Sequence, residues 1–170
     1  MVTCRSCAMP IQEFFSLGKL PLVNSFLRKK DLLKEKKFGL SVAFCPSCYL
    51  VQLKKTISPK DLFQDYIYFS STSKTILTHC QKTASYLTQR LHLTTNSLVL
   101  EIASNDGVLL QFFKKLGVQI LGVDPAKNIA KVANKKGIKT IAEFFSYSFA
   151  RKLVSTDNVH ADLVYGDNVL

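Results

Sequence analysis

The sequence predicts an α/β protein in which a small four-cysteine domain is followed by a truncated parallel sheet of the doubly wound type. Two Cys-x-x-Cys pairs within the first 50 residues predict the small domain. From residue 98 onward, short apolar runs alternate with helical patterns, and this alternation predicts the parallel sheet. Of the 170 residues, 47% are hydrophobic and 21% are charged, a composition typical of a soluble globular protein.

The two cysteine pairs are Cys4 with Cys7 and Cys45 with Cys48. Each turn presents two thiolates, and two such turns complete the tetrahedral ligand set that Zn²⁺ prefers. A site filled by four protein ligands has no position for a reacting water, so we expect a structural zinc. Redox-active or free thiols are the weaker alternative, because thioredoxin-like chemistry uses one pair beside a βαβ unit. The fifth cysteine, Cys80, is expected to be a small buried residue.

Residues 1–57 are predicted to form this zinc-binding domain as a knuckle-and-hairpin unit. Within 38–44, apolar residues alternate with small ones, as in a strand with one buried face. The run 50–53 predicts a second strand directly after the second cysteine pair.

Residues 58–95 are predicted to be a helical linker region. Pro59 is expected to begin a short helix, and Ser71, Thr72 or Ser73 is expected to cap a longer one. Apolar residues spaced by three and four give that longer helix one apolar face: Ile76, Cys80, Ala84, Leu87 and Leu91.

Residues 96–170 are predicted to form the first half of a domain that binds a nucleoside cofactor. The expected strands are 98–102, 119–124, 139–141 and 161–165. The expected helices are centred on 109–113, 125–133 and 149–154. Short strands that alternate with helices of this length are typical of a parallel sheet, whose strands are buried on both faces.

A polar loop follows the first of these strands, where a parallel sheet of this kind binds its ligand. Small residues in the loop allow a ligand to approach the backbone closely. A carboxylate at the end of the second strand is placed to accept hydrogen bonds from ribose hydroxyls. The predicted cofactor-binding residues are Glu101, Ala103, Ser104, Asn105, Asp106, Gly107, Asp124 and Pro125.

The charge of this loop favours one cofactor over another. A dinucleotide site needs several glycines to cradle a pyrophosphate, whereas this loop has only Gly107 and carries Asp106. An acidic loop repels a pyrophosphate and suits a cationic cofactor such as S-adenosylmethionine, and Glu101 adds to that preference. NAD and an unliganded scaffold are the alternatives.

The net charge of +11 is concentrated in the first half of the chain. Residues 1–90 hold 14 Lys and Arg against 5 Asp and Glu, whereas residues 91–170 hold 9 against 7. A basic half suits an anionic partner, either a nucleic acid or a phosphate-bearing small molecule, although a merely solvated lysine-rich face explains it as well. A zinc-ribbon module that binds nucleic acid is therefore the alternative function. Acids at the ends of both strands argue against it.

The chain shows no sign of a membrane or secretory segment. No apolar run reaches the roughly 18 residues that a membrane span needs. The N-terminus also lacks the apolar core of a signal peptide. We therefore expect a cytoplasmic location and no membrane partner.

An ordered set of motifs covers the whole chain and resembles one enzyme family. The set comprises residues 4–7, 21–24, 45–53, 66–71, 100–107, 122–126 and 167–170. This order resembles the zinc-containing, S-adenosylmethionine-dependent sugar C-methyltransferases, which act on nucleotide-linked 4-ketohexoses in deoxysugar biosynthesis. The resemblance implies a Rossmann-like methyltransferase fold and a nucleotide-linked sugar as substrate. Residues Tyr66, Tyr68 and Ser71 match the family motif that faces the active site, and ordinary packing is the alternative for them.

The resemblance also implies that groups needed for catalysis lie outside this chain. Family members continue for well over a hundred residues, and the expected catalytic base, a histidine, lies just past Leu170. We therefore expect a fragment that is inactive alone, and a second chain that completes the sheet is one expected partner. The histidines of this chain, His79, His92 and His160, are expected to be structural or solvated.

Two positions depart from the family pattern. Tyr49 stands where the family tends to have glycine, so the knuckle must place a bulky residue in a left-handed turn. Ala103 stands where many methyltransferases have glycine, and its methyl group narrows the approach of the cofactor.

Overall fold

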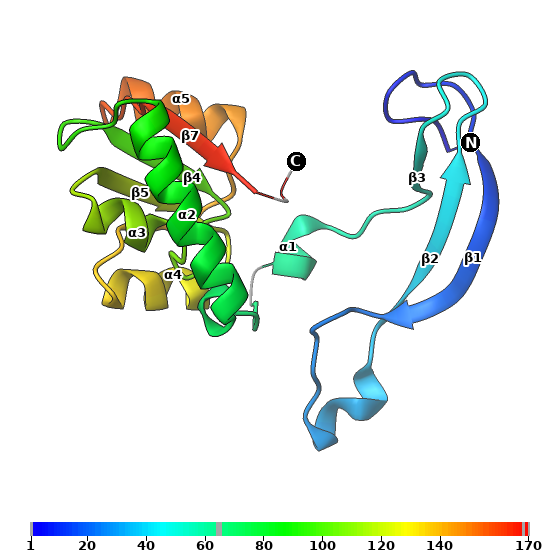
Figure 1. Cartoon of the computed structure of the whole chain (residues 1–170). Helices are drawn as coiled ribbons and strands as arrows, with labels where there is room; N and C mark the ends of the chain where they lie inside the picture. Colours follow the sequence, from blue (N-terminus) through cyan, green and yellow to red (C-terminus); the bar gives the residue numbers. More distant parts are fainter. Residues whose placement is uncertain (1, 64–65, 168, 170) are drawn as a thin grey trace. The chain divides into compact units, whose positions relative to one another are not determined.

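The computed structural model describes residues 2–63, 66–167 and 169, and the chain divides into two compact units, Met1–Leu62 and Phe63–Leu170 (Figure 1). Unit 1 contains both cysteine pairs, and unit 2 contains the parallel sheet. An α/β fold with a cysteine cluster and a parallel sheet is thus confirmed. The boundaries 1–57, 58–95 and 96–170 stay a prediction.

Unit 1 is built on a three-stranded antiparallel sheet in the order β1-β2-β3. Its strands are β1 (Gln12–Pro21), β2 (Lys37–Phe44) and β3 (Val51–Leu53). A 3-10 helix, η1 (Lys29–Lys34), lies in the long connection between β1 and β2. The helix α1 (Pro59–Phe63) begins, as predicted, at the proline that follows Ser58.

Strand β1 was not assigned a range from the sequence, and its register explains why. The pairing with β2 shifts between Glu13 and Phe15 and again between Ser16 and Lys19. Such irregularities break the two-residue period on which strand recognition depends. All of β1 is exposed, so it also has no buried face that would produce an alternating pattern.

Unit 1 has almost no apolar core. Among its described residues, those buried from solvent are Cys4, Ala43, Cys45 and Gln52. Large apolar side chains such as Phe14, Phe15 and Leu17 remain half exposed on β1. The hydrophobic effect therefore contributes little to the fold of this unit, and its stability depends on the cysteine cluster.

Unit 2 contains a four-stranded parallel sheet in the order β6-β5-β4-β7 (Figure 1). The strands are β4 (Leu98–Ile102), β5 (Gln119–Val123), β6 (Thr140–Ile141) and β7 (Leu163–Gly166). The helices are α2 (Lys74–Arg90), α3 (Leu110–Lys115), α4 (Lys127–Lys135) and α5 (Tyr147–Ser155), and a short 3-10 turn, η2 (Ser70–Thr72), precedes α2. These strands and helices match the predicted alternation.

The two faces of β4 pack against different helices. Successive strand residues point to opposite faces, so Val99 joins the core formed with α2 and α3, whereas Leu100 joins the core formed with α5 and its Leu153. By the same alternation, Glu101 lies on the face of Val99. This places its carboxylate toward α2.

Helix α2 belongs to the core of unit 2 instead of forming a separate connection. Its residues Cys80 and Ala84 are buried in the cluster that also contains Phe113 of α3. Four of the five residues predicted for the apolar face, Ile76, Cys80, Ala84 and Leu87, pack in this core. The prediction is wrong for Leu91, which follows the last turn of the helix and is 45% exposed. The helix begins at Ser73, whose Oγ accepts a hydrogen bond of 3.4 Å from the backbone N–H of Ile76.

Strand β7 is paired on one side only within the described part of the chain. Its residues pair in parallel with β4, for example Val164 with Leu100. Val164 is 54% exposed. An apolar strand of this kind, with one free edge, presents backbone groups that another strand can pair with.

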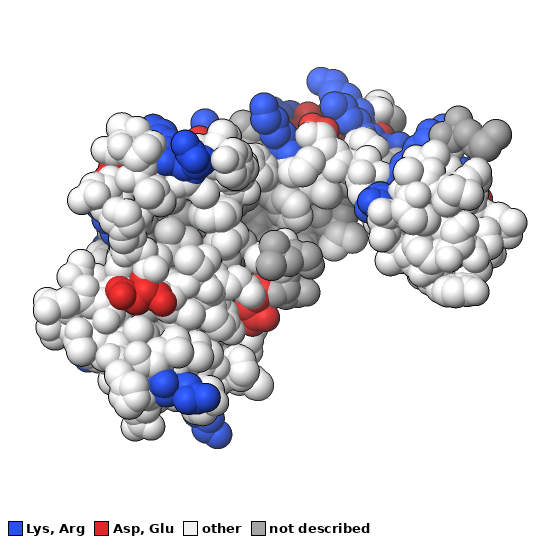
Figure 2. All heavy atoms as spheres, turned by 90° about the horizontal axis from the view of Figure 1, so that it is seen from above, with Lys and Arg blue, Asp and Glu red and all other residues white. Residues whose placement is uncertain are grey.

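None of the helices in the described ranges combines the length and the apolar character needed to cross a bilayer. On the face drawn in Figure 2, lysine and arginine side chains form separate groups with uncharged surface between them.

Candidate functional sites

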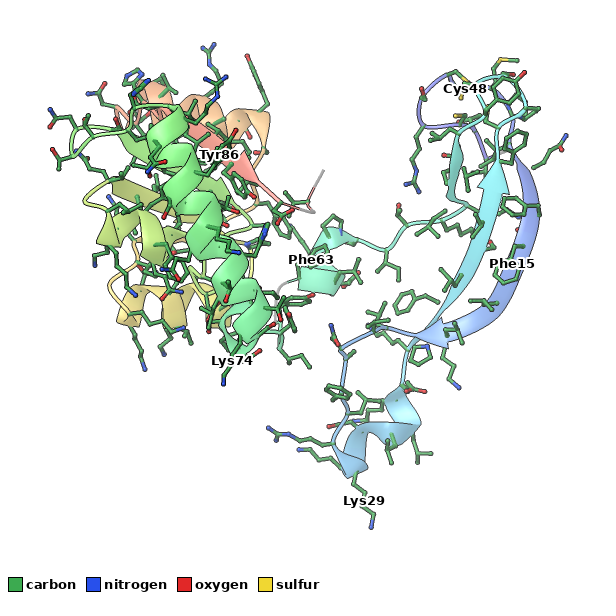
Figure 3. The ribbon with its side chains drawn as sticks, viewed as in Figure 1. Phe15, Lys29, Cys48, Phe63, Lys74 and Tyr86 are labelled. Atoms are coloured by element: carbon green, nitrogen blue, oxygen red, sulfur yellow. The ribbon has the colours of Figure 1, made fainter. Side chains whose placement is uncertain are left out.

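Two knuckle turns bring the four cysteines of unit 1 together. Their Sγ atoms all lie within 4.8 Å of one another. Across the two knuckles, Cys4 Sγ lies 3.5 Å from Cys48 Sγ, and Cys7 Sγ lies 3.5 Å from Cys45 Sγ. In Figure 3 the sulfur atoms gather beside the labelled Cys48. Four sulfurs at these separations form a closed, four-ligand metal site.

Each knuckle closes with the same backbone hydrogen bonds. The N–H of Ala8 donates to the carbonyl of Cys4 (2.9 Å), and the N–H of Tyr49 donates to the carbonyl of Cys45 (2.8 Å). Both donors have a left-handed backbone, with φ of 60° at Ala8 and 62° at Tyr49. The left-handed turn expected at Tyr49 is therefore present, without the glycine that most easily adopts it.

The backbone around the first cysteine of each knuckle stabilises a thiolate. A hydrogen bond from the backbone of Cys7 lowers the pKa of the Cys4 thiol to about 6. A hydrogen bond from the backbone of Cys48 likewise lowers the pKa of the Cys45 thiol below its usual value. Because zinc binds the deprotonated sulfur, these N–H donors favour the form that a metal requires.

Unit 2 contains a cavity of about 530 Å³ at the carboxyl end of β4. Helix α2, the loop after β4 and the end of β7 form its walls. The polar residues among those that line it are Tyr68, Ser70, Thr75, His79, Thr83, Glu101, Ser104, Asn105, Tyr165 and Asp167. A volume of this size suits a small cofactor or metabolite.

Glu101 lies on the wall of this cavity, and the residue is 7% exposed. Its Oε2 has no hydrogen-bond partner within the described residues. Burial raises the pKa of this carboxyl well above its usual value, and the nearby carboxylates of Asp167, Asp124 and Asp106 raise it further. A buried carboxylate in this state gains most from a bound cation that donates hydrogen bonds.

A second unpaired oxygen lies on the wall of the same cavity as Glu101. Ser104 is 1% exposed and lines the cavity, yet its Oγ also has no partner among the residues described. Its position depends on Gly122 in β5, because a Cβ there would lie 2.4 Å from Ser104 Oγ. Gly122 in β5 thus leaves room for the hydroxyl of Ser104 on the cavity wall.

Asp124 follows β5 and holds the loop after β4 in place. Its Oδ2 accepts a hydrogen bond from the N–H of Asn105 (2.9 Å), and its Oδ1 accepts one from the N–H of Ala126 (2.9 Å). Burial raises the pKa of this carboxyl, while the two N–H donors act in the opposite direction. Ala103 and Asn105 both have positive φ, 54° and 50°, so the loop turns sharply at these two residues.

Four of the eight predicted cofactor-binding residues are not part of the cavity wall. Asp106 is 1% exposed, and its carboxylate binds Ser71 and Lys136. Gly107 has a φ of +78°, and a Cβ there would lie 2.7 Å from Ile138 Cδ1, so its small size serves packing against that side chain. Pro125 and Asp124 also lie outside the residues that line the cavity.

The predicted substrate-binding residues have different surroundings. Tyr68 lines the cavity. Tyr66 exchanges hydrogen bonds with Asn128 through its backbone, and Ser71 donates its hydroxyl and its N–H to Asp106. The structure therefore brings Tyr68 together with Glu101, Ser104, Asn105 and Ala103, whereas Tyr66 and Ser71 are engaged elsewhere.

The sequence analysis did not identify the cavity residues of α2 and β7. His79, which was expected to be structural or solvated, lines the cavity together with Cys80 and Thr83. These positions share one helix face with Ile76 at spacings of three and four, and this signal could have found them. Asp167 follows β7 and lies at the same sheet edge as the loop after β4.

Comparison with known proteins identifies both parts of the chain. The sequence model of a family described as "Putative zinc binding domain" matches residues 4–63. The C-methyltransferase NovU of Streptomyces niveus is 35% identical over 165 residues, which cover 96% of this chain and 39% of that protein. The chain thus spans about two fifths of the length of this curated relative.

Several solved methyltransferase structures overlap with part of the chain. The plantazolicin methyltransferase BpumL in complex with S-adenosylhomocysteine is 24% identical, with a TM-score of 0.35 over 44% of this chain and 32% of that chain. Magnesium protoporphyrin IX methyltransferase from Synechocystis PCC 6803 is 17% identical, with a TM-score of 0.33 over 41% of this chain and 39% of that chain. We transfer no residue role from overlaps of this extent.

The four-cysteine cluster lies inside the region that the family model matches. The similarity to NovU continues beyond it, through the parallel sheet. Residues 4–63 thus match a zinc-binding domain family, and nearly the whole chain is similar in sequence to the C-methyltransferase NovU.

Proposed function

We propose that this chain is the zinc-binding and cofactor-binding part of an S-adenosylmethionine-dependent C-methyltransferase. The observation that carries the proposal is the pair of buried, unpaired oxygens, Glu101 Oε2 and Ser104 Oγ, on the wall of one cavity. S-adenosylmethionine has a positively charged sulfonium and a positively charged ammonium group, and the ammonium donates hydrogen bonds. A cavity whose wall contains a buried carboxylate with an unpaired oxygen is suited to such a ligand.

Individual residues have distinct parts in this proposal. Glu101 binds a cationic group of the cofactor, and Ser104 accepts a hydrogen bond from it or donates one to it. Asn105 and Ala103 form the loop wall beside them. Asp124 retains a free lone pair on each oxygen and is assigned to the ribose hydroxyls, while it holds the N–H groups of Asn105 and Ala126.

The zinc has a structural role in this proposal. All four sites of a tetrahedral ion are taken by Cys4, Cys7, Cys45 and Cys48, so no position is left for a substrate or water. Few residues of unit 1 are buried, so apolar burial contributes little to its stability. Metal–thiolate bonds supply the folding free energy instead.

The proposed substrate is a nucleotide-linked 4-ketohexose, as the resemblance to sugar C-methyltransferases implies. The ketone makes the neighbouring carbon acidic, because the carbanion charge spreads into an enolate, and the methyl group is then transferred to that carbon. A base must remove the proton and donors must hold the enolate oxygen. We assign the base to a histidine beyond these 170 residues.

The free edge of β7 is the proposed attachment point for the rest of the enzyme. Val164 is half exposed there. A further strand, from a longer form of this protein or from a second chain, would cover it. We accordingly expect no methyl transfer by residues 1–170 alone, and we retain a cytoplasmic location as a prediction.

Isothermal calorimetry on the zinc-loaded chain tests the cofactor assignment. We expect S-adenosylmethionine and S-adenosylhomocysteine to bind and NADH not to bind. Glu101→Gln should weaken S-adenosylmethionine by about tenfold to a hundredfold, in line with hydrogen bonds to charged groups. The exposed carboxylate of Asp157 supplies the control, and Asp157→Asn should leave binding unchanged. Binding of NADH in preference to the methyl donor would refute the assignment.

A further inference from the structure

The segment Tyr66–Thr72, which we call the strap, crosses the rim of the cavity with little regular structure of its own. Its only helical turn is η2. Two strap residues, Tyr68 and Ser70, line the cavity. The strap nevertheless has a defined course, because side chains from distant parts of unit 2 bind its backbone at three places.

Two asparagines bind the first part of the strap. Asn128 of α4 donates its Nδ2 to the carbonyl of Tyr66 (2.6 Å), and its Oδ1 accepts from the N–H of Tyr66 (3.3 Å). Asn105 donates its Nδ2 to the carbonyl of Tyr68 (3.1 Å), and its Oδ1 accepts from the N–H of Ser70 (3.0 Å). Each side-chain amide thus satisfies one backbone donor and one backbone acceptor, as a neighbouring strand would.

An ion pair between a buried carboxylate and a partly exposed lysine binds the last part of the strap. Asp106 Oδ1 accepts a hydrogen bond from the N–H of Ser71 (3.3 Å), and Oδ2 accepts one from the hydroxyl of the same residue. Lys136 Nζ lies 2.7 Å from Asp106 Oδ2 and 3.4 Å from Ser71 Oγ. The side chain of Asp106 is 0% exposed, whereas that of Lys136 is 44% exposed. The positive charge of Lys136 therefore offsets the free-energy cost of burying the carboxylate of Asp106.

We propose that Asp106 and Lys136 are positioning residues that hold the strap closed along the cavity and thereby place Tyr68 and Ser70 against the bound ligand. The identity of that ligand rests on the proposed function, but the closure of the strap does not. In this assignment Asp106 does not touch the cofactor, although it lies in the loop that the sequence marks as cofactor-binding. Ser71 likewise acts through Asp106 and not on the substrate.

A buried charge without a partner of opposite charge costs free energy. Without Lys136, the carboxylate of Asp106 is left buried with only the serine as partner, and it must gain water or move outward. Either change separates it from the N–H and hydroxyl of Ser71, so the last anchor of the strap is lost. Asn105 still holds the N–H of Ser70, so the loosening should be greatest at Ser71, whose N–H and hydroxyl lose Asp106.

Hydrogen exchange on the zinc-loaded, ligand-free chain tests closure directly. Lys136→Met should speed exchange of the Ser71 amide, which donates to Asp106, by about tenfold or more, the factor that corresponds to loss of a hydrogen-bonded charge. Lys136→Arg should restore slow exchange because it retains the cation. Lys135→Met removes the adjacent lysine, for which no contact with Asp106 exists among the described residues, and should behave as the unmodified chain. Unchanged exchange in Lys136→Met would overturn the proposal.

A double variant keeps the test valid if Lys136→Met unfolds unit 2. Asp106→Asn with Lys136→Met removes both charges together, and exchange within α3 reports whether the fold persists. We expect α3 to remain protected and the strap to exchange faster than in the unmodified chain. Protection of the strap equal to that of the unmodified chain would show that the ion pair does not hold it.

Calorimetry with S-adenosylhomocysteine then separates positioning from direct contact. Lys136→Met should weaken binding by about tenfold, and Lys136→Arg should recover it. If Asp106 instead contacts the ligand, Asp106→Asn weakens binding while the strap amides stay protected, and the positioning role is refuted. If the unmodified chain does not bind S-adenosylhomocysteine at all, the proposed function fails, while the exchange experiment still decides whether the ion pair closes the strap.

Discussion

Ala8 and Tyr49 occupy the same position in the two knuckles of the metal site. Each follows the second cysteine of its pair, each has φ close to +60°, and each donates its N–H to the carbonyl of the first cysteine. The Tyr49 side chain also has an aromatic neighbour, because its ring centroid lies 6.1 Å from that of Phe44. The two positions therefore respond differently to glycine.

Ala8→Gly should stabilise zinc-bound unit 1 by about 1 kcal/mol, because glycine adopts positive φ without the steric cost that a Cβ imposes. Tyr49→Gly gains the same term but loses the contact with Phe44, worth about 0.5–1.5 kcal/mol, so its net change should be close to zero. Denaturant unfolding of the zinc-loaded protein measures both. A stabilisation at Tyr49 as large as that at Ala8 would show that the aromatic contact contributes nothing.

Removal of one zinc ligand should unfold unit 1. Cys45→Ser is expected to abolish the stoichiometric zinc found by metal analysis and to remove the unit's cooperative unfolding, because few of its described side chains are buried. The fifth cysteine supplies the matched control. Cys80→Ala in unit 2 should retain one zinc per chain and lose about 1 kcal/mol of stability in unit 2 alone.

Retention of a folded unit 1 in metal-free Cys45→Ser would contradict this account. An unmodified chain that is folded after chelation would contradict it as well, since the apolar core would then have to suffice.

The stability of unit 2 should fall as the pH rises above the usual pKa of glutamate. Glu101 has a raised pKa in the folded chain, so between about 4.5 and that raised value the folded state binds more protons than the unfolded state. Stability contributed by the neutral form is therefore present below that range and is lost through it, at up to about 1.4 kcal/mol per pH unit. Glu101→Gln should flatten this dependence, as followed by thermal unfolding from pH 4 to 8.

Asp157→Asn removes an exposed carboxylate from the same unit and should leave the slope unchanged. A slope that persists in Glu101→Gln would assign the effect to another buried group, such as Asp124.

Gly122→Ala should disturb the cavity wall by displacing the side chain of Ser104. The new Cβ would lie 2.4 Å from Ser104 Oγ and 2.8 Å from Thr140 Oγ1, so the serine must move. We expect a loss of about 1–3 kcal/mol in unfolding free energy, typical of an overpacked core, together with weaker binding of S-adenosylmethionine. Gly39→Ala is the control, because no atom lies within 4 Å of a Cβ there. Full cofactor affinity in Gly122→Ala would exclude Ser104 from the site.

The sequence was sufficient to predict the elements that follow a strict period or a fixed spacing. The parallel strands of unit 2 are short apolar runs, and Ser73 caps α2 as one of three expected candidates. Strand β1 was missed because its register shifts break the period. Local pattern alone could not show that Asp106 turns away from the cavity, because its partner Lys136 lies 30 positions further along the chain.

The cavity shows the same limit. Glu101 was identified because it ends a buried strand, where a charge is unusual. His79 was not, because its spacing on α2 indicates which face of the helix it shares but not what that face packs against. Where the role of a residue depends on which helix or strand packs against it, the role can be identified only from the tertiary structure.

The strap has a consequence for the order in which the chain acquires its structure. It precedes all of its anchors in the sequence, so during synthesis residues 66–72 leave the ribosome before Asp106, Asn128 and Lys136 exist to hold them. Pairing of β4 with β7 likewise joins residues far apart, as in Leu100 with Val164, and contacts of such separation form late. The wall of the cavity is therefore among the last parts of unit 2 to assemble, whereas the β2–β3 hairpin of unit 1 can form while translation continues.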